Sequence, residues 1–149
     1  MTDHYSVCET ALLVKVATLT GYFTAKQIAA SDDTIIGLGH DYYAVAYPGG
    51  FSASQEATGL MRLEWTIYLD LYVRYKTEKT TWERVKALRS DVLNLLNTDR
   101  TLNANNAIDV IANAAEDPQY FVPKNAPNGP PAFVMQRLSV AVTQIVNRS

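Results

Sequence analysis

The sequence predicts an α+β fold in which a mainly antiparallel sheet, with two long strands, carries helices packed on one face. Two stretches predict the long strands: apolar and polar residues alternate through residues 62–76 and again through residues 133–146. A third observation predicts the helices, since apolar residues recur every three or four positions after Tyr5 and after Thr80. The 149 residues, 48% of them hydrophobic, suit a single domain over 1–149.

The N-terminal part of the chain predicts one amphipathic helix followed by connecting structure. Ser6 and Glu9 have the spacing of a capping box, and the apolar stripe ends near Gly21. Residues 24–30 suit a further short helical turn. Serine, aspartate and glycine punctuate residues 31–40, so that segment is assigned as a connection.

A hairpin with a long flexible loop is expected next. Residues 41–47 are rich in tyrosine and alanine, include one valine, and suit a strand that stops at Pro48. Residues 48–61 are mostly small and polar, and loops of this length are usually functional or disordered. The residues expected to contact a partner there are Pro48, Gly49, Gly50, Phe51, Ser52, Gln55 and Glu56.

The strand over residues 62–76 is long enough to reach beyond its own domain. At roughly 3.4 Å per residue its apolar run extends for about 40 Å, and a domain of this length is about 40 Å across. An overhanging strand exposes unpaired backbone groups to another chain, which favours oligomerisation. Its polar face is expected to be solvated, and tyrosine on that face favours contact with another subunit. The expected interface residues are Tyr42, Thr66, Tyr68, Asp70, Tyr72 and Arg74.

The remaining chain predicts one helix, one ambiguous segment and two strands. An apolar stripe over residues 80–96 predicts a helix that packs on the dry face of the sheet. Residues 107–115 are alanine-rich enough for a short helix, although the run IDVI also suits a strand. A short strand over 119–122 and the long strand over 133–146 flank residues 123–131, whose prolines predict an exposed loop.

The sequence assigns no catalytic residue, no cofactor site and no metal site. The strongest acid–base candidates suit turns and match no metal signature; they are Asp32, Asp33, His40 and Asp41. Cys8 lies on the apolar stripe of the first helix, where a small buried thiol is common. The chain is therefore not expected to be an enzyme.

The composition of the chain limits the cellular compartment and the binding partners that can be expected. A single cysteine excludes an intramolecular disulfide and fits a reducing compartment. A formal net charge of -2 argues against broad nucleic-acid binding. Apolar runs fall short of the roughly 18 residues of a membrane span, and the first residues lack a basic secretory segment. The protein is expected to stay in the cytoplasm where it is made.

A local excess of basic residues accompanies the second helix. These residues are Arg74, Lys76, Lys79, Arg84, Lys86 and Arg89. Acidic residues are interspersed among them, at Glu78, Glu83 and Asp91. Two interpretations stay open at this point, a solvated helix face and a surface for an acidic partner.

The chain resembles the tail terminator, or tail completion, proteins of long-tailed bacteriophages. The resemblance spans residues 6–146 and rests on the order of elements and on four segments, LEWTIYLDLYVRY, TTWERVKALRSDVLNLL, DPQYFVP and FVMQRLSVAVTQIV. Proteins of that family are non-enzymatic α+β proteins that form a hexameric ring on the end of the tail tube. The ring stops tube polymerisation and presents a surface to the head connector.

The resemblance implies a virion protein that assembles in the host cytoplasm as a homo-hexamer, with tail tube and head connector proteins as partners. It also implies that residues 48–61 project towards the ring lumen or a docking partner. One alternative is another neck, minor tail or head completion protein. A second is a small cone-shaped enzyme or ligand-binding domain, which would need histidine or acidic residues on the inward face of the long strands. That face carries apolar residues over 63–75.

Overall fold

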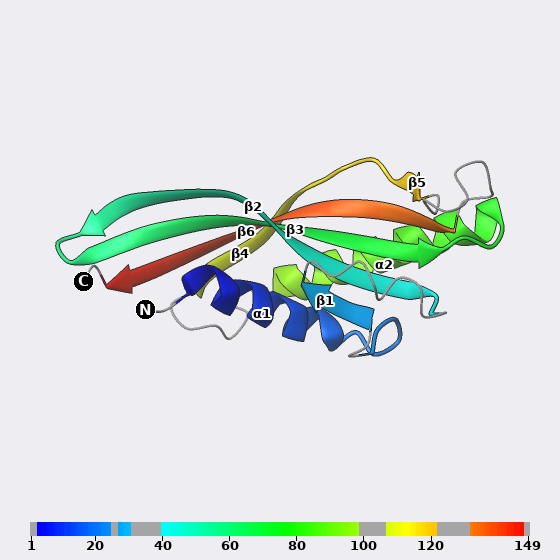
Figure 1. Cartoon of the computed structure of the whole chain (residues 1–149), viewed down its shortest axis with the longest axis horizontal. Coiled ribbons are helices and arrows are strands. Elements are labelled where there is room, and N and C mark those ends of the chain that lie inside the picture. The colour runs from blue at the N-terminus through cyan, green and yellow to red at the C-terminus, as the bar shows by residue number, and fades with distance from the viewer. Residues whose placement is uncertain (1–2, 25–26, 31–39, 99–106, 122–131, 148–149) are drawn as a thin grey trace.

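A computed structural model of the chain describes residues 3–24, 27–30, 40–98, 107–121 and 132–147. Its elements confirm the α+β class (Figure 1). In chain order they are α1 (His4–Ala17), β1 (Ile28–Ala30), β2 (Tyr42–Ala57), β3 (Leu60–Arg74), α2 (Glu78–Thr98), β4 (Ala107–Ala115), β5 (Gln119–Phe121) and β6 (Phe133–Asn147).

The strands form one sheet in the order β1-β2-β3-β6-β4, with β5 paired to β6 beside the path. β3 is the central strand and pairs antiparallel with β2 on one side and with β6 on the other. β4 and β5 both pair antiparallel with β6, at successive positions along it. Among the described strands, only the short β1 is parallel to its neighbour, β2. The sheet is therefore mainly antiparallel, as the alternating pattern predicts.

Both helices pack on the same face of the sheet, where they enclose the main core. Every second residue of β3 faces them, including Ile67, Leu69 and Leu71, each at most 3% exposed. Register places Leu138 and Val140 of β6 beside Leu69 and Ile67. The helical stripes that meet this face are Cys8, Leu12 and Val16 of α1 and Val85, Leu88, Val92 and Leu96 of α2. Burial of each such aliphatic side chain contributes about 1.5–3 kcal/mol.

The ends of the helices differ from the expected caps. Asp3 caps α1, because its carboxylate accepts a hydrogen bond from the Ser6 backbone N–H at 3.0 Å. Ser6 therefore lies inside the first turn instead of capping it, and the helix ends at Ala17, short of Gly21. α2 likewise begins at Glu78, with Thr77 accepting from the Thr80 N–H at 3.2 Å. Among the described residues, no helix is long and apolar enough to cross a membrane.

Two segments with ambiguous or helical patterns are strands. Ile28–Ala30, expected in a helical turn, forms β1 because it pairs with residues 44–46 of β2. Ala107–Ala115 forms β4, since β6 offers it an open edge and tertiary pairing overrides the helix propensity of alanine. Residues 31–39 of the predicted connection over 31–40 fall outside the described residues, as does the predicted loop over 123–131.

The face opposite the helices carries a second, smaller apolar cluster. Tyr43, Val45, Tyr72 and Phe133 form it, each at most 5% exposed. The rings of Tyr43 and Phe133 meet edge to face, with centroids 5.6 Å apart. The expectation of a wholly solvated face is therefore wrong at Tyr72.

Candidate interaction surfaces

Asp70 and Arg137 form a tight ion pair on the face opposite the helices. They are direct partners across β3 and β6. Arg137 donates from Nε to one carboxylate oxygen at 2.7 Å and from Nη2 to the other at 3.0 Å. The side chain of Asp70 is 2% exposed, whereas that of Arg137 is 32% exposed. Asp70 was expected to face solvent; it is buried because Arg137 covers it.

Aromatic rings and a second carboxylate complete the surroundings of Arg137. Its Cζ lies 4.8 Å from the ring centroid of Tyr68 and 5.8 Å from that of Tyr47. Glu116 approaches Nε at 3.8 Å. The hydrogen bonds to Asp70 raise the pKa of Arg137, and the nearby carboxylates act in the same direction. A guanidinium fixed by a bidentate carboxylate and by flanking rings is held in one orientation, and two nearby carboxylates leave this cluster without a net positive charge.

The expected interface residues do not share one surface. Thr66 and Tyr68 lie half-buried on the face opposite the helices, as expected. Tyr42 pairs in register with Val73 and meets the ring of Tyr22 edge to face at 5.0 Å, which places it on the helix side. Tyr72 belongs to the second apolar cluster. The assignment of these residues to a subunit interface stays a prediction.

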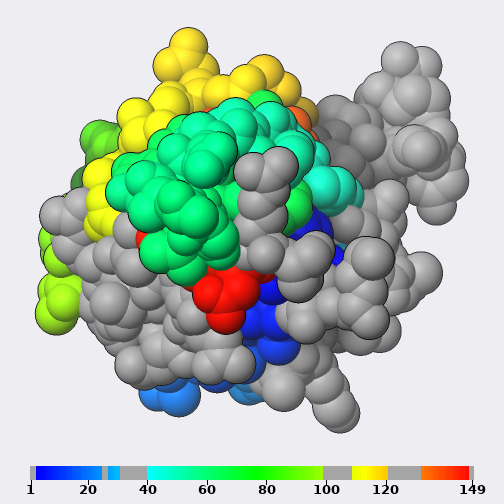
Figure 2. Space-filling view, turned by 90° about the vertical axis from the view of Figure 1, so that its left-hand side faces the viewer, coloured from blue at the N-terminus to red at the C-terminus, as the bar shows by residue number. Residues whose placement is uncertain are grey.

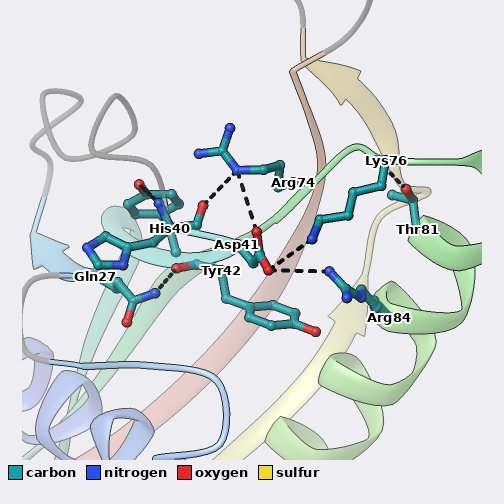
Figure 3. A network of polar contacts seen from close by, with 9 residues as sticks. Gln27, His40, Asp41, Tyr42, Arg74, Lys76, Thr81 and Arg84 are labelled. Carbon is teal, nitrogen blue, oxygen red and sulfur yellow. Dashed lines mark hydrogen bonds and ion pairs between the residues drawn. The ribbon is translucent and has the colours of Figure 1, made fainter.

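Asp41 is the centre of a charged network at the base of the hairpin (Figure 3). Its carboxylate lies 3.6 Å from Arg74 Nε, 3.4 Å from Lys76 Nζ and 3.5 Å from Arg84 Nη1. The Arg74 Nε also donates to the carbonyl oxygen of His40 at 3.1 Å. The end of β3 and the first turns of α2 thus bring three cations to the start of β2.

Part of the local excess of basic residues around α2 is gathered on one surface, around Asp41. One carboxylate faces three cations, so the group keeps a positive charge. Between 31% and 46% of the side chains of Arg74, Lys76 and Arg84 remains exposed. The buried Gln27 anchors the base by donating to the carbonyl oxygen of Tyr42 at 2.8 Å. An acidic partner group would find partly desolvated cations here, which strengthens ion pairing relative to open water.

The hairpin arm, defined as residues 48–66, is the most exposed regular structure in the described chain. All residues of 50–59 are exposed. Figure 1 shows the β2–β3 end of the sheet reaching past both helices, and Figure 2 views that end head-on, with the tip of the hairpin towards the viewer. A two-residue turn joins Ala57 to Leu60, and Gly59 in it adopts φ 78°, a conformation that favours glycine.

The expected flexible loop over 48–61 is wrong, because these residues continue β2 and β3 as paired strands. The pairing contains two irregularities, between Pro48 and Phe51 and between Gln55 and Ala57. A Cβ at Gly49 would lie 2.9 Å from the Thr66 carbonyl oxygen, so only glycine allows the two backbones to approach this closely. Proline is accepted at 48 because β1 stops pairing at Ala46, which leaves an edge.

An aromatic ladder fastens the arm to α1. The ring centroids of Phe51 and Trp65 lie 4.5 Å apart, and Trp65 meets Tyr5 of α1 at 5.5 Å. Trp65 also donates from Nε1 to the buried Gln144 at 2.8 Å. Phe51 itself remains 56% exposed. The remaining expected contact residues, Ser52, Gln55 and Glu56, are exposed on the same strand.

Of the acid–base candidates, His40 and Asp41 lie in the described part of the chain, and both are engaged in other contacts. His40 donates its backbone N–H to the Tyr43 hydroxyl at 2.9 Å, and Asp41 is committed to its three cations. Asp32 and Asp33 fall outside the described residues. Cys8 is fully buried, and burial raises the pKa of its thiol to about 11. Within the described ranges, no group of three or more His, Cys, Asp or Glu residues is placed to hold a metal ion.

Arg137 is the residue that sequence reasoning missed. It occupies an ordinary polar position in the alternation of residues 133–146, so nothing in its own segment distinguishes it. Its partner Asp70 lies 67 positions away in the chain. The alignment of β3 with β6, had it been known, would have placed the two opposite charges side by side.

The fold is similar to that of a chain in the virion of a native gene transfer agent particle. The similarity covers 99% of this chain and 100% of that chain, at 11% sequence identity and a TM-score of 0.52. A second solved structure shares 12% identity over 99% of both chains, at a TM-score of 0.49. No family model and no curated protein matches the sequence. At such low identity the likeness shows a shared fold.

Proposed function

We propose that this protein is a structural component of a phage-like virion, and more specifically a tail terminator. In this role a hexameric ring of the protein caps the tail tube, ends its polymerisation and presents the surface that joins the head. The hairpin arm carries the proposal, because it extends regular, exposed structure beyond the helix-covered body. The likeness to a virion chain over the whole length supports it.

The two ends of the sheet differ in chemistry, as a protein between two partners requires. The arm end exposes small polar residues, the ring of Phe51 and charges of both signs, at Glu56, Arg62 and Glu64. The opposite end, where β2 begins and β3 ends, carries the cations around Asp41. A ring built from such subunits has one rim of mixed charge and one basic rim. The tail tube and the head connector could then be recognised by different surfaces of one ring.

The proposed role involves no catalysis, cofactor, metal, nucleic acid or membrane. Assembly would take place in the host cytoplasm, and the finished protein would reside at the head end of the tail. Another neck, minor tail or head completion role would use the same kind of surfaces. Tail length separates these roles, since only loss of a terminator releases tube growth.

Electron microscopy of particles made without this protein tests the proposal. We expect headless tubes of excess and variable length, and restoration of uniform joined tails when the wild-type protein is supplied. A matched pair of variants refines the test: Lys76→Glu alters the basic end, and Lys86→Glu makes the same change at an exposed position further along α2. The first should impair joining and the second should not. Tails of normal length joined to heads in the absence of the protein would exclude the terminator role.

A further inference from the structure

The sheet has two open edges in the described part of the chain. On one side, β1 pairs only with residues 44–46 of β2, and no described strand pairs with the outer edge of residues 48–57. On the other side, β4 is the last strand in the order. Open edges display unpaired N–H and C=O groups and are templates for pairing with a further strand.

Residues 51–55 of β2 lack the devices that usually protect an edge, although Pro48, Glu56 and two irregularities of pairing flank them. Natural edges are blunted by charged side chains, proline, bulges or short length. Residues 51–55, with the sequence FSASQ, contain no charge and no proline and keep a regular register with β3. They are exposed on both faces. This stretch is therefore available for pairing over five consecutive residues.

The opposite edge offers a matching stretch. Val110, Ile111 and Ala112 lie between the two irregularities of β4 and keep a regular register with β6. Ile111 is 39% exposed, and Tyr120 of β5, on the same side of β6, is 49% exposed. Together with Phe51 they are three of the four large hydrophobic side chains exposed in the described chain. Both open edges thus carry exposed apolar groups, a mark of contact surfaces.

The directions of the strands make the two edges compatible. β2, β3, β6 and β4 alternate in direction, so β2 and β4 run opposite ways. Rotation of one copy about an axis parallel to the strands brings its β4 antiparallel to the β2 of the next copy. Such a contact is head to tail, which is the kind of interface that closes a ring.

We infer that residues 51–55 of one copy pair with residues 110–112 of a second copy as antiparallel strands, so that the sheet continues from subunit to subunit. This inference rests on the proposed ring and names its subunit contact. Within a subunit, Ser52 and Ser54 pair with Glu64 and Arg62, and Ile111 pairs with Ala141. These partners lie on one face of the sheet. In the proposed contact, Ser52 and Ser54 of the first copy therefore lie on the same sheet face as Ile111 of the second.

Cysteine cross-linking tests this contact in assembled protein. The native Cys8 is fully buried, and the chain contains no other cysteine, so introduced thiols are the reactive ones. We would combine Ile111→Cys with Ser52→Cys and, separately, with Ser54→Cys. At least one combination should give a ladder of disulfide-linked oligomers under oxidising conditions. Ser90→Cys on the exposed side of α2, combined with Ile111→Cys, is the matched control and should give none.

The outcomes separate this contact from the ring itself. Cross-linking by Ser52→Cys or Ser54→Cys alone would mean that two β2 edges pair with each other and would overturn the inference. Rings visible by electron microscopy without any ladder would overturn the inference and leave the proposed function standing. A ladder without closed rings would support the strand contact and count against the terminator. The absence of both would overturn both.

A second pair of variants avoids dependence on cross-linking geometry. Ser54→Lys places a charge at the outer edge of β2, and Ser90→Lys makes the same change on α2. Both positions are exposed, so neither change should alter the melting temperature of the subunit. We expect Ser54→Lys to reduce ring assembly by tenfold or more and Ser90→Lys to leave it unchanged. Equal assembly by both variants would contradict the edge contact.

Discussion

The inner and outer halves of the β2–β3 hairpin differ in burial. In the inner half, Tyr43, Ala44, Val45 and Ala46 are all fully buried, between the helices on one face and the second apolar cluster on the other. In the outer half, which is the arm, all residues of 50–59 are exposed. The chain thus keeps regular structure well beyond what its core requires, which suggests that the arm serves contact and the inner half serves stability.

Element lengths explain why the halves differ. A strand of 15 or 16 residues extends for about 50 Å, whereas α1, with 14 residues, spans about 21 Å. α2 packs against the inner half, and α1 reaches the arm only at its first turns, where Tyr5 meets Trp65. The tip of the hairpin therefore lies beyond the helices. Its stability depends on strand pairing and on the Phe51–Trp65 contact.

Truncation in the inner half should have the largest effect on stability. Leu69→Ala should lower the free energy of unfolding by about 2–5 kcal/mol, because it leaves a cavity beneath both helices. Phe51→Ala in the arm should cost about 1 kcal/mol or less, because the ring is already more than half exposed. Chemical denaturation of both variants measures the difference. Equal losses would show that the arm belongs to the stabilising core.

Removal of Arg137 should have the next largest effect. Arg137→Met leaves the buried carboxylate of Asp70 without its bidentate partner, and should cost about 1–3 kcal/mol. Asp70→Asn should cost less, because the guanidinium it leaves behind is partly exposed to water. Urea titrations of the two variants and of the double variant give the coupling. A double variant whose loss equals the sum of the single losses would mean that the two side chains act independently.

A methyl group at the base of the arm should have a smaller effect that depends on its position. Gly49→Ala places a Cβ 2.9 Å from the Thr66 carbonyl oxygen and 3.0 Å from the Tyr68 ring, so it should cost about 1–2 kcal/mol. Gly50→Ala meets no atom within 4 Å and should be neutral or slightly stabilising. Thermal melts of the pair check this. A larger loss at Gly50 than at Gly49 would contradict the packing at the bulge.

The last expected effect is negligible at neutral pH and develops only in alkali, as a dependence of stability on pH through Cys8. Burial raises the pKa of this thiol from 9.0 to about 11. Above pH 9 the thiol ionises in the unfolded chain and stays protonated in the folded chain, so its contribution to stability falls as pH rises to about 11. Cys8→Ala lacks this contribution. Wild type should therefore lose stability relative to Cys8→Ala between pH 9 and 11, and parallel pH profiles would contradict the burial of the thiol.

Sequence patterns predict the inner half well because one face of each strand is dry. The alternation of residues 62–76 and 133–146 places β3 and β6 within a few residues of their observed ends and assigns Leu69 and Leu138 to the core. It fails at Asp70, because the second apolar cluster and the ion pair depend on which strands are neighbours. Which strands are neighbours is set by the tertiary structure and cannot be read from the alternation of residues within one strand.

The alternation of apolar and polar residues does not predict the strands of the arm, and the reason is physical. A strand with both faces wet has no apolar alternation, so the segment GGFSASQEA reads as a loop. The turn at Thr58 and Gly59 was a usable signal, since a residue pair ending in glycine between two equal stretches suits a tight hairpin. β4 was ambiguous because alanine favours a helix locally while β6 supplies a pairing edge.

Hydrogen exchange tests most directly whether the arm is kept for contact. In the isolated subunit, backbone amides of residues 51–55 that face the open edge should exchange at least tenfold faster than those of residues 43–46, because no described strand covers that edge. After assembly into particles, the same amides should become protected while residues 43–46 change little. Amides of residues 51–55 that exchange equally fast before and after assembly would contradict a contact role for the arm.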